Sequence, residues 1–139
     1  MQTYDPKNWD LVLGGNLITG WGDNTFISIT KESEAYEDAA GVDGEVVRGR
    51  KHDERATLEI TLMRTSASNQ ILSDMYNLGR QSANGEDIFS ARLVNREGSS
   101  EHKAAEAWVQ DAPAVSLEGG PNTTTWKVRL AKYKENHAD

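Results

Sequence analysis

The three histidines are the first residues of this chain to consider for catalysis or metal binding. His52, His102 and His137 are far apart in the sequence and each has charged, turn-forming neighbours, so we expect solvated surface residues. The spacings typical of a zinc protease helix or a calcium-binding loop do not occur in the sequence. The chain also has no cysteine, which excludes disulfides, thiolate metal sites and cysteine nucleophiles. We therefore predict no metal site and no cofactor.

Two glutamates have positions that would suit glycoside hydrolysis, which uses a pair of carboxyl groups. Glu59 and Glu106 each lie in the middle of an expected strand. The alternation of apolar and polar residues around both makes a solvent-facing position the more natural interpretation. Serines are numerous, but none lies in a Gly-x-Ser-x-Gly elbow, the turn that positions a hydrolase nucleophile. We predict that the protein is not an enzyme.

Four tryptophans offer ring surfaces for stacking sugars, so a β-rich ligand- or carbohydrate-binding module is an alternative function. Trp126 alternates with Val128 and Leu130, and we therefore assign it to the core. Trp108 shares its face of a strand with polar neighbours. Because aromatic residues are enriched at the centres of protein interfaces, Trp108 is a candidate subunit contact.

The stretch that organises the expected fold is residues 56–80. Apolar and polar residues alternate over 57–62, which predicts a strand with one buried and one solvent-facing side. From residue 66 onward the apolar spacing becomes i, i+1, i+4, i+7, and we predict one flanking helix over residues 66–79. Ser66 would cap its first turn, and Gly79 would end it in a left-handed conformation.

Strand patterns and turn signals fill the rest of the chain, at the spacing typical of a β-sandwich or barrel. We expect a mainly β fold of about seven or eight antiparallel strands with one helix. Its 139 residues are enough for a single domain with a real core. No apolar run approaches the roughly 20 residues that cross a bilayer, and the first residues lack a signal peptide pattern, so we expect synthesis in the cytoplasm.

Charge is distributed unusually over residues 32–55. Residues 32–44 are acidic and poor in large apolar residues, so we predict a long loop, and structureless loops beyond about 12 residues are usually functional or disordered. Residues 48–55 are the densest basic cluster of the chain and could instead form a phosphate patch. An acidic edge beside a basic edge suits head-to-tail self-association. The candidate contacts here are Glu32, Glu34, Tyr36, Glu37, Asp38, Asp43, Arg48, Arg50, Lys51 and Arg55.

The formal net charge is −7, from 22 acidic and 15 basic residues. A surface of this sign repels phosphate, which argues against tight binding of nucleic acid. The same sign would suit a protein that lets DNA pass without holding it.

Seven segments, spread over nearly the whole chain, occur in a recognisable order. They are YDP (4–6), the glycine hairpin (14–15), GWGDNTFISI (20–29), GVDGEVVR (41–48), TLEITLMRTSASNQIL (57–72), EAWV (106–109) and TTWKVRLA (124–131). With these segments the chain resembles a bacteriophage tail tube protein of a compact phage-structural family. The inner tube of type VI secretion systems shares this design.

The resemblance implies a structural virion protein, six copies of which close a ring, with rings stacked into the inner tube of a phage tail. DNA would pass through the lumen on ejection without specific binding, and the protein would be assembled in the host cytoplasm. Its partners would be further copies of the chain and the tail sheath, terminator and baseplate proteins, with no membrane insertion. The segment at about 32–55 would reach an adjacent subunit or ring. The inner tube of a phage-derived secretion or contractile injection system is the near alternative.

Lumen positions have no motif, so the resemblance does not assign them. Strands with a polar face must meet water, as those of a porin-like lumen do. We therefore take Thr57, Glu59 and Thr61 as candidate lumen residues, on the polar face of the strand expected at 57–62. A barrel closed across subunits would also remove exposed strand edges.

Overall fold

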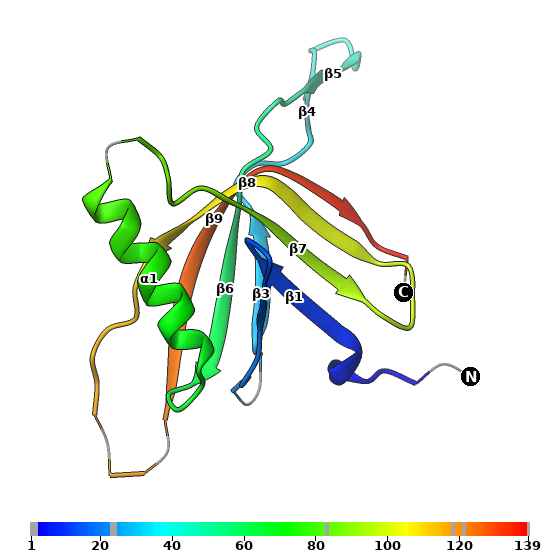
Figure 1. Cartoon of the computed structure of the whole chain (residues 1–139). Helices are drawn as coiled ribbons and strands as arrows, with labels where there is room; N and C mark the ends of the chain where they lie inside the picture. Colours follow the sequence, from blue (N-terminus) through cyan, green and yellow to red (C-terminus); the bar gives the residue numbers. More distant parts are fainter. Residues whose placement is uncertain (1–2, 23–24, 83, 118, 121, 139) are drawn as a thin grey trace.

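The computed structural model describes residues 3–22, 25–82, 84–117, 119–120 and 122–138. These residues form nine strands, one α-helix and one 3-10 turn (Figure 1). In chain order they are η1 (Pro6–Asn8), β1 (Trp9–Leu13), β2 (Asn16–Ile18), β3 (Ile27–Lys31), β4 (Tyr36–Ala40), β5 (Val46–Arg50), β6 (Ala56–Met63), α1 (Ser68–Gln81), β7 (Phe89–Asn95), β8 (Glu101–Asp111) and β9 (Thr123–Asn136). The predicted mainly β fold with one flanking helix is confirmed.

Seven strands form one antiparallel sheet in the order β2-β1-β7-β8-β9-β6-β3. The two longest strands, β8 and β9, lie side by side at its centre. The sheet curls into a shell, so that its two edges approach each other. The segment that follows β2, at one edge, contacts β6, which lies next to β3 at the opposite edge. There Met63 N donates to Gly20 O at 2.8 Å, and Trp21 bridges to Leu62. Elsewhere in the described part of the chain, β1 and β3 face each other without being paired.

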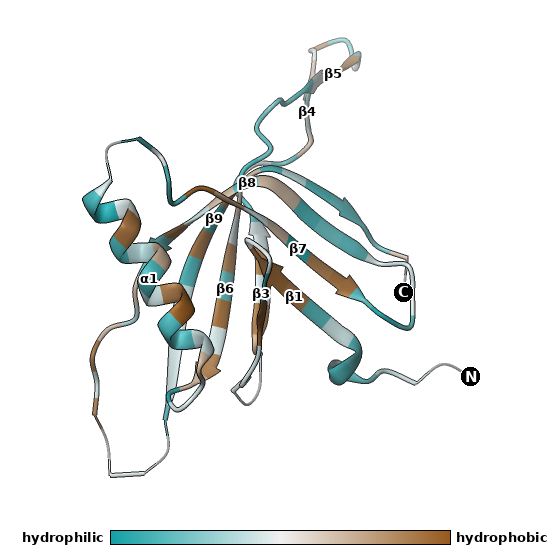
Figure 2. Cartoon of the chain, viewed as in Figure 1, coloured by the Kyte–Doolittle hydropathy of each residue, from teal (hydrophilic) through white to brown (hydrophobic). Residues whose placement is uncertain are grey.

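The inner side of this shell is the hydrophobic core. In β6 the alternation is complete, with Leu58, Ile60 and Leu62 at most 1% exposed. Trp126 of β9 is buried with them, as predicted, and Leu72 places α1 against the same core. Figure 2 shows the corresponding hydrophobic bands along β6 and β1. Each such aliphatic side chain stabilises the fold by about 1.5–3 kcal/mol on burial.

The helix is displaced by two residues from its predicted bounds, because Ser66 and Gly79 have other roles. Ser66 Oγ accepts from Ser68 N at 3.2 Å, but it also donates to Thr19 O at 2.6 Å, and α1 begins only after it. The prediction that Gly79 ends α1 is wrong. A Cβ at Gly79 would lie 2.4 Å from an Asp87 carboxylate oxygen, so this glycine lets the segment before β7 approach the helix.

Asn69 is the residue that joins the start of α1 to the sheet. Its Nδ2 donates to the carbonyl oxygens of Met63, Arg64 and Ser66 at 3.0–3.1 Å. Its Oδ1 accepts from the two inward-facing side chains at the start of β9, Thr124 Oγ1 at 2.7 Å and Trp126 Nε1 at 3.0 Å. The S-x-S-N sequence at 66–69 therefore connects β6, β9 and Thr19, the residue after β2, to one helical turn.

The loop predicted at residues 32–44 is wrong, because these residues include β4. β4 and β5 pair as an antiparallel hairpin that projects from the sheet (Figure 1). Its turn uses Gly44 at φ +90, with Gly41 N donating to Glu45 O at 2.8 Å. All ten strand residues are exposed, so neither face of β4 carries the apolar alternation from which a strand is predicted. The helices in the described residues fall short of the length and apolar character that a membrane crossing requires.

Candidate assembly interfaces

Residues 32–55 form a projecting unit that we call the arm. Within it the acidic and basic runs lie opposite each other across the hairpin. Lys51 Nζ lies 3.6 Å from Glu37 Oε2, and the guanidinium of Arg48 lies 4.4 Å from the ring centre of Tyr36. Asp38 is the cross-strand partner of Arg48. The two separate edges of opposite charge that we expected are therefore not present, since antiparallel pairing brings the two runs together.

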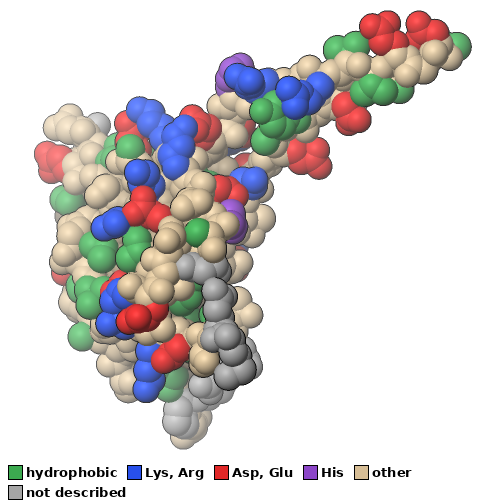
Figure 3. Space-filling model, turned by 90° about the vertical axis from the view of Figure 1, so that its right-hand side faces the viewer, with side chains coloured by type: hydrophobic (Ala, Val, Ile, Leu, Met, Phe, Trp, Pro, Cys, Tyr) green, Lys and Arg blue, Asp and Glu red, His purple; other side chains and the backbone are tan. Residues whose placement is uncertain are grey.

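The tip of the arm, residues 38–47, keeps an uncompensated charge. Its three charged residues are Asp38, Asp43 and Glu45, and it contains no lysine or arginine. Val42 is fully exposed, and the two valines of β5 are more than half exposed. Figure 3 shows acidic side chains at the far end of the arm and basic ones closer to the sheet. An isolated two-stranded hairpin is marginally stable in water, so the arm gains little stability from its own two strands.

One strand of the arm is held at its root by Asp53. Arg55 donates to both carboxylate oxygens of Asp53 at 2.9 Å, and Ser33 Oγ donates to Oδ2 at 2.9 Å. The side-chain hydrogen bonds from Arg55 are the main reason that the pKa of Asp53 lies well below its usual range. The hydrogen bond from Ser33 joins the two ends of the arm to each other, and the fork shows that Arg55 makes an intrachain contact.

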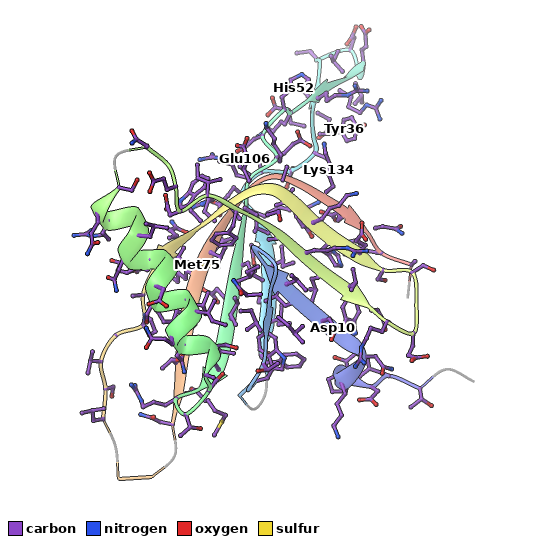
Figure 4. The ribbon with its side chains drawn as sticks, in the orientation of Figure 1. Asp10, Tyr36, His52, Met75, Glu106 and Lys134 are labelled. Carbon is purple, nitrogen blue, oxygen red and sulfur yellow. The ribbon has the colours of Figure 1, made fainter. Side chains whose placement is uncertain are left out.

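The other anchor of the root is Glu32, which ties the arm to the sheet. Thr57 Oγ1 donates to Glu32 Oε1 at 2.6 Å, and this bond is the first cause of the lowered pKa of Glu32. Arg129 Nη1 lies 2.9 Å from the same oxygen, an ion pair in which the N–H is not aligned for a hydrogen bond. Glu34 and Arg50 remain exposed near the root. Figure 4 shows Lys134, which pairs with Glu54, beside the place where the arm leaves the sheet.

The outer face of the sheet carries the candidate lumen residues. Thr57, Glu59 and Thr61 alternate with the buried residues of β6 and point outward, as predicted. Glu59 Oε1 lies 3.9 Å from Lys127 Nζ, and the hydroxyls of Thr61 and Thr125 are 3.4 Å apart. Glu59 on this face is thus paired with a lysine, and threonine hydroxyl groups lie beside the pair. The excess negative charge of the chain lies elsewhere, including the arm tip.

Trp108 lies on the same side of the sheet. It is half-buried between the buried residues Ala107 and Val109, and its cross-strand partner is Arg129. Trp108 therefore shares its face with the candidate lumen residues, so its predicted role as a subunit contact and the predicted lumen role of this face are alternatives, and both stay predictions.

A hollow of about 500 Å³ opens between β1 and β3. Its lining includes Trp9, Phe26, Ile27, Ile29, His102 and Tyr133. The prediction of solvated histidines holds for the exposed His52 and is wrong for His102. His102 lies in β8, half-buried, with Nδ1 2.8 Å from Tyr133 Oη and its ring edge-on to His137 at 4.8 Å.

Burial dominates the electrostatics of this hollow. It lowers the pKa of His102, and His137 adds to that effect. It raises the pKa of Tyr133 to about 12. The cluster was not visible in the sequence because His102 and His137 come together only through the pairing of β8 with β9. Among the described residues, no group of three or more acidic or histidine side chains is arranged to hold a metal ion.

A sequence profile described as the bacteriophage PhiTE tail tube protein matches residues 12–136, which include the sheet, the arm and the helix. The chain belongs to this tail tube family. The resemblance found in the sequence is thereby confirmed, and the protein is a structural component of a phage tail.

Two further comparisons show which protein sequences and which solved structures this tail tube protein is similar to. The structural protein ORF10 of Pseudomonas phage KPP10 is 20% identical over 141 residues, 97% of this chain and 82% of that protein. The sheath/tube terminator of the PVC extracellular contractile injection system in its extended state has a TM-score of 0.63 at 8% identity, covering 99% of both chains. The tube-terminating cap of the anti-feeding prophage has a TM-score of 0.61 at 7% identity, covering 98% of this chain and 92% of that one. At these identities the structural likeness concerns the fold.

The two carboxylates considered for glycoside hydrolysis have structural partners in this tail tube protein. Glu59 pairs with Lys127, as described above, and Glu106 Oε1 accepts from Lys132 Nζ at 3.1 Å. Each is therefore held in an ion pair on the sheet surface, and the described residues show no contact between them.

Proposed function

We propose that this tail tube protein closes into rings of six copies, and that the rings stack into the tube through which DNA is ejected. The observation that carries the proposal is the arm, an unsupported hairpin with an acidic, apolar tip and a firmly anchored root. A surface of this kind fits a different surface on another copy. Such heterologous contacts generate rings when the rotation closes and stacks when it does not.

The basic residues near the root are the matching surface for the tip. Arg50 is exposed there, and Arg48 and Lys51 lie on the same strand or directly after it. Asp43 and Glu45 of a neighbouring copy would face them, in the same ring or in the next. Complementary charges steer association and fix its register more than they add affinity. The arm would thus determine which copy sits where.

The outer face of the sheet would line the lumen, with Thr57, Glu59 and Thr61 toward the DNA. Its hydroxyls and its paired charges present no net positive surface to phosphate. Affinity for DNA depends on phosphates neutralised by lysine and arginine, so a face of this kind lets DNA move.

The remaining partners would be the sheath, the terminator and the baseplate of a contractile tail, met during assembly in the host cytoplasm. The likeness to a sheath/tube terminator and to a PVC sheath-tube complex (TM-score 0.59, 8% identity, 99% of this chain and 90% of that one) supports this part of the proposal.

Electron microscopy of the purified protein at high concentration and moderate salt tests the proposal. We expect rings or hollow rods about 80–100 Å across, the width for six domains of about 30 Å. The double variant Asp43→Lys/Glu45→Lys should lose them and stay a folded monomer. Its matched control, Glu86→Lys/Glu97→Lys, makes the same charge change on exposed loops away from the arm.

Two results would count against the proposal. If the wild-type protein forms only small particles even with preformed tube ends as seeds, a ligand- or carbohydrate-binding module becomes the better interpretation, and glycan screening follows. If both double variants lose assembly equally, net charge matters and the arm does not.

A further inference from the structure

The hollow between β1 and β3 has a free strand edge along one side. At the two ends of β3, Thr61 N donates to Phe26 O and Glu32 N donates to Arg55 O. Every second residue of an antiparallel strand bonds to its neighbour, so these bonds turn the backbone groups of the odd-numbered residues toward the open edge. Ile27 is one of them, and its side chain lines the hollow. An extended segment entering here would gain both main-chain bonds and an apolar site.

A segment with the matching properties lies in the loop between β8 and β9. Val115 is 84% exposed and Leu117 is 78% exposed, although both are large and apolar. In an extended chain, residues i and i+2 point to the same side. The segment is held from behind, because the carbonyl oxygen of Ser116 accepts from Arg64 Nη2 at 3.2 Å and Asn122 Nδ2 at 2.8 Å. It therefore presents two apolar side chains on an anchored backbone.

The loop and the hollow lie on opposite sides of the molecule. Figure 1 shows the loop beside α1, and β1 with the segment before it on the other side. His137, close to the C-terminus, lines the hollow. One copy is therefore not placed to fill its own hollow with its own loop, and a second copy is required.

Charge favours this loop over the arm tip as the segment that occupies the hollow. The basic groups around the hollow already have partners: Arg96 Nε lies 3.1 Å from Asp10 Oδ2, and Lys31 Nζ lies 3.7 Å from Glu135 Oε2. The arm tip, residues 38–47, would bring three carboxylates and no lysine or arginine to this rim, whereas residues 112–117 carry no charge. Burying an unpaired charge is costly, so the neutral loop fits and the tip does not.

We propose that residues 114–117 of one copy dock into the hollow between β1 and β3 of a second copy, with Val115 and Leu117 inserted among its apolar and aromatic side chains. The proposal rests on the self-assembly proposed above and adds a second contact to that of the arm. The pairing is heterologous, since loop and hollow are different surfaces, so it repeats from copy to copy.

Cysteine cross-linking tests this contact directly, because the natural chain has no cysteine. Leu117→Cys protein is mixed with His137→Cys protein, allowed to assemble and then oxidised. We expect a disulfide-linked pair, which forms between copies by construction. The control mixture, Val42→Cys with His137→Cys, places the cysteine on the arm tip and should give no linked pair.

The outcomes separate this proposal from the proposed function. Tubes without the Leu117→Cys link, or with the Val42→Cys link in its place, overturn the loop contact and leave the tube standing. Absence of both tubes and link, even with preformed tube ends as seeds, overturns both proposals.

A substitution gives a second measurement. Leu117→Asp should raise the concentration needed for assembly by at least about tenfold, since a charge would enter an apolar site, while Leu117→Met should assemble like the wild type. Because the side chain is exposed, we expect both monomers to melt at the wild-type temperature. Assembly of Leu117→Asp at the wild-type concentration would contradict the contact.

Discussion

β6 and β4 are both antiparallel strands, yet their side chains have opposite surroundings. In β6 every second residue is buried, and the strand is paired on both sides, with β3 and β9. In β4 all five residues are exposed, and the strand pairs only with β5. The sheet is therefore stabilised by burial within one copy, whereas the arm has little of its own to stabilise it. The difference divides the molecule into a part that is stable by itself and a part that, in the proposed function, contacts other copies.

The strongest test of this division is a pair of truncations. Leu58→Ala should destabilise the monomer by about 2–5 kcal/mol, because it leaves a cavity in a fully buried position. Val47→Ala in β5 should leave the monomer unchanged, because that side chain is already exposed. Urea unfolding followed by far-ultraviolet circular dichroism measures both. Equal losses would contradict the division.

A smaller loss is expected at the junction of α1 with the sheet. Asn69→Ala should cost about 2–3 kcal/mol, because it leaves the buried groups Trp126 Nε1 and Thr124 Oγ1 without their acceptor. Asn77→Ala, at an exposed position of the same helix, is the control and should change little. Thermal unfolding of the two variants decides, and a similar melting temperature for both would show that the hydrogen bonds of Asn69 contribute nothing.

His102 should make the stability of the folded protein depend on pH. Its folded-state pKa lies below 6.5, its ordinary value, so below about pH 6.5 the unfolded chain binds the extra proton and stability falls as pH is lowered. The groups that face it are His137, Glu135 and Tyr133. We expect His102→Phe to flatten the decline between pH 6.5 and 5.5, with His52→Gln on the arm as the control. An unchanged slope in His102→Phe would assign the effect to other groups.

The smallest expected effect on the monomer is that of removing most of the arm. Replacing residues 36–50 by a short glycine-serine linker should leave the melting temperature within about 2 °C, since the hairpin buries no core residue. The same variant should form no tubes. A large drop in melting temperature would show that the arm stabilises the sheet, so that arm and sheet would not differ in this respect.

The sequence was informative where one copy buries its side chains. Buried Leu58, Ile60 and Leu62 recur at every second position of the sequence, and the apolar residues of α1 recur at helical spacing. Both elements could therefore be predicted. β4 was missed because neither of its faces is buried in the monomer. The role of Gly79 was missed because it depends on how closely Asp87 approaches, which no local pattern encodes.

The candidate contacts were predicted less well, for a related reason. Charge composition located the arm but not its pairing, since only the hairpin register brings Glu37 to Lys51. The hollow around His102 also depends on register. Asn69 stood in a segment that marked the family, but two of its five hydrogen bonds reach β9, 55 and 57 residues away in the sequence, which no local pattern encodes.

The fork between Arg55 and Asp53 at the root of the arm has a geometric consequence for anything built from many copies. β4 alone is five residues long, or about 17 Å at about 3.3 Å per residue, so a tilt of about 5° at the root moves the tip by about 1.5 Å. In the proposed tube, errors of that size would add up over successive rings and bend the cylinder. A rigid root would then keep the tube straight, and weakening it, as in Asp53→Asn, should give curved rods of normal width.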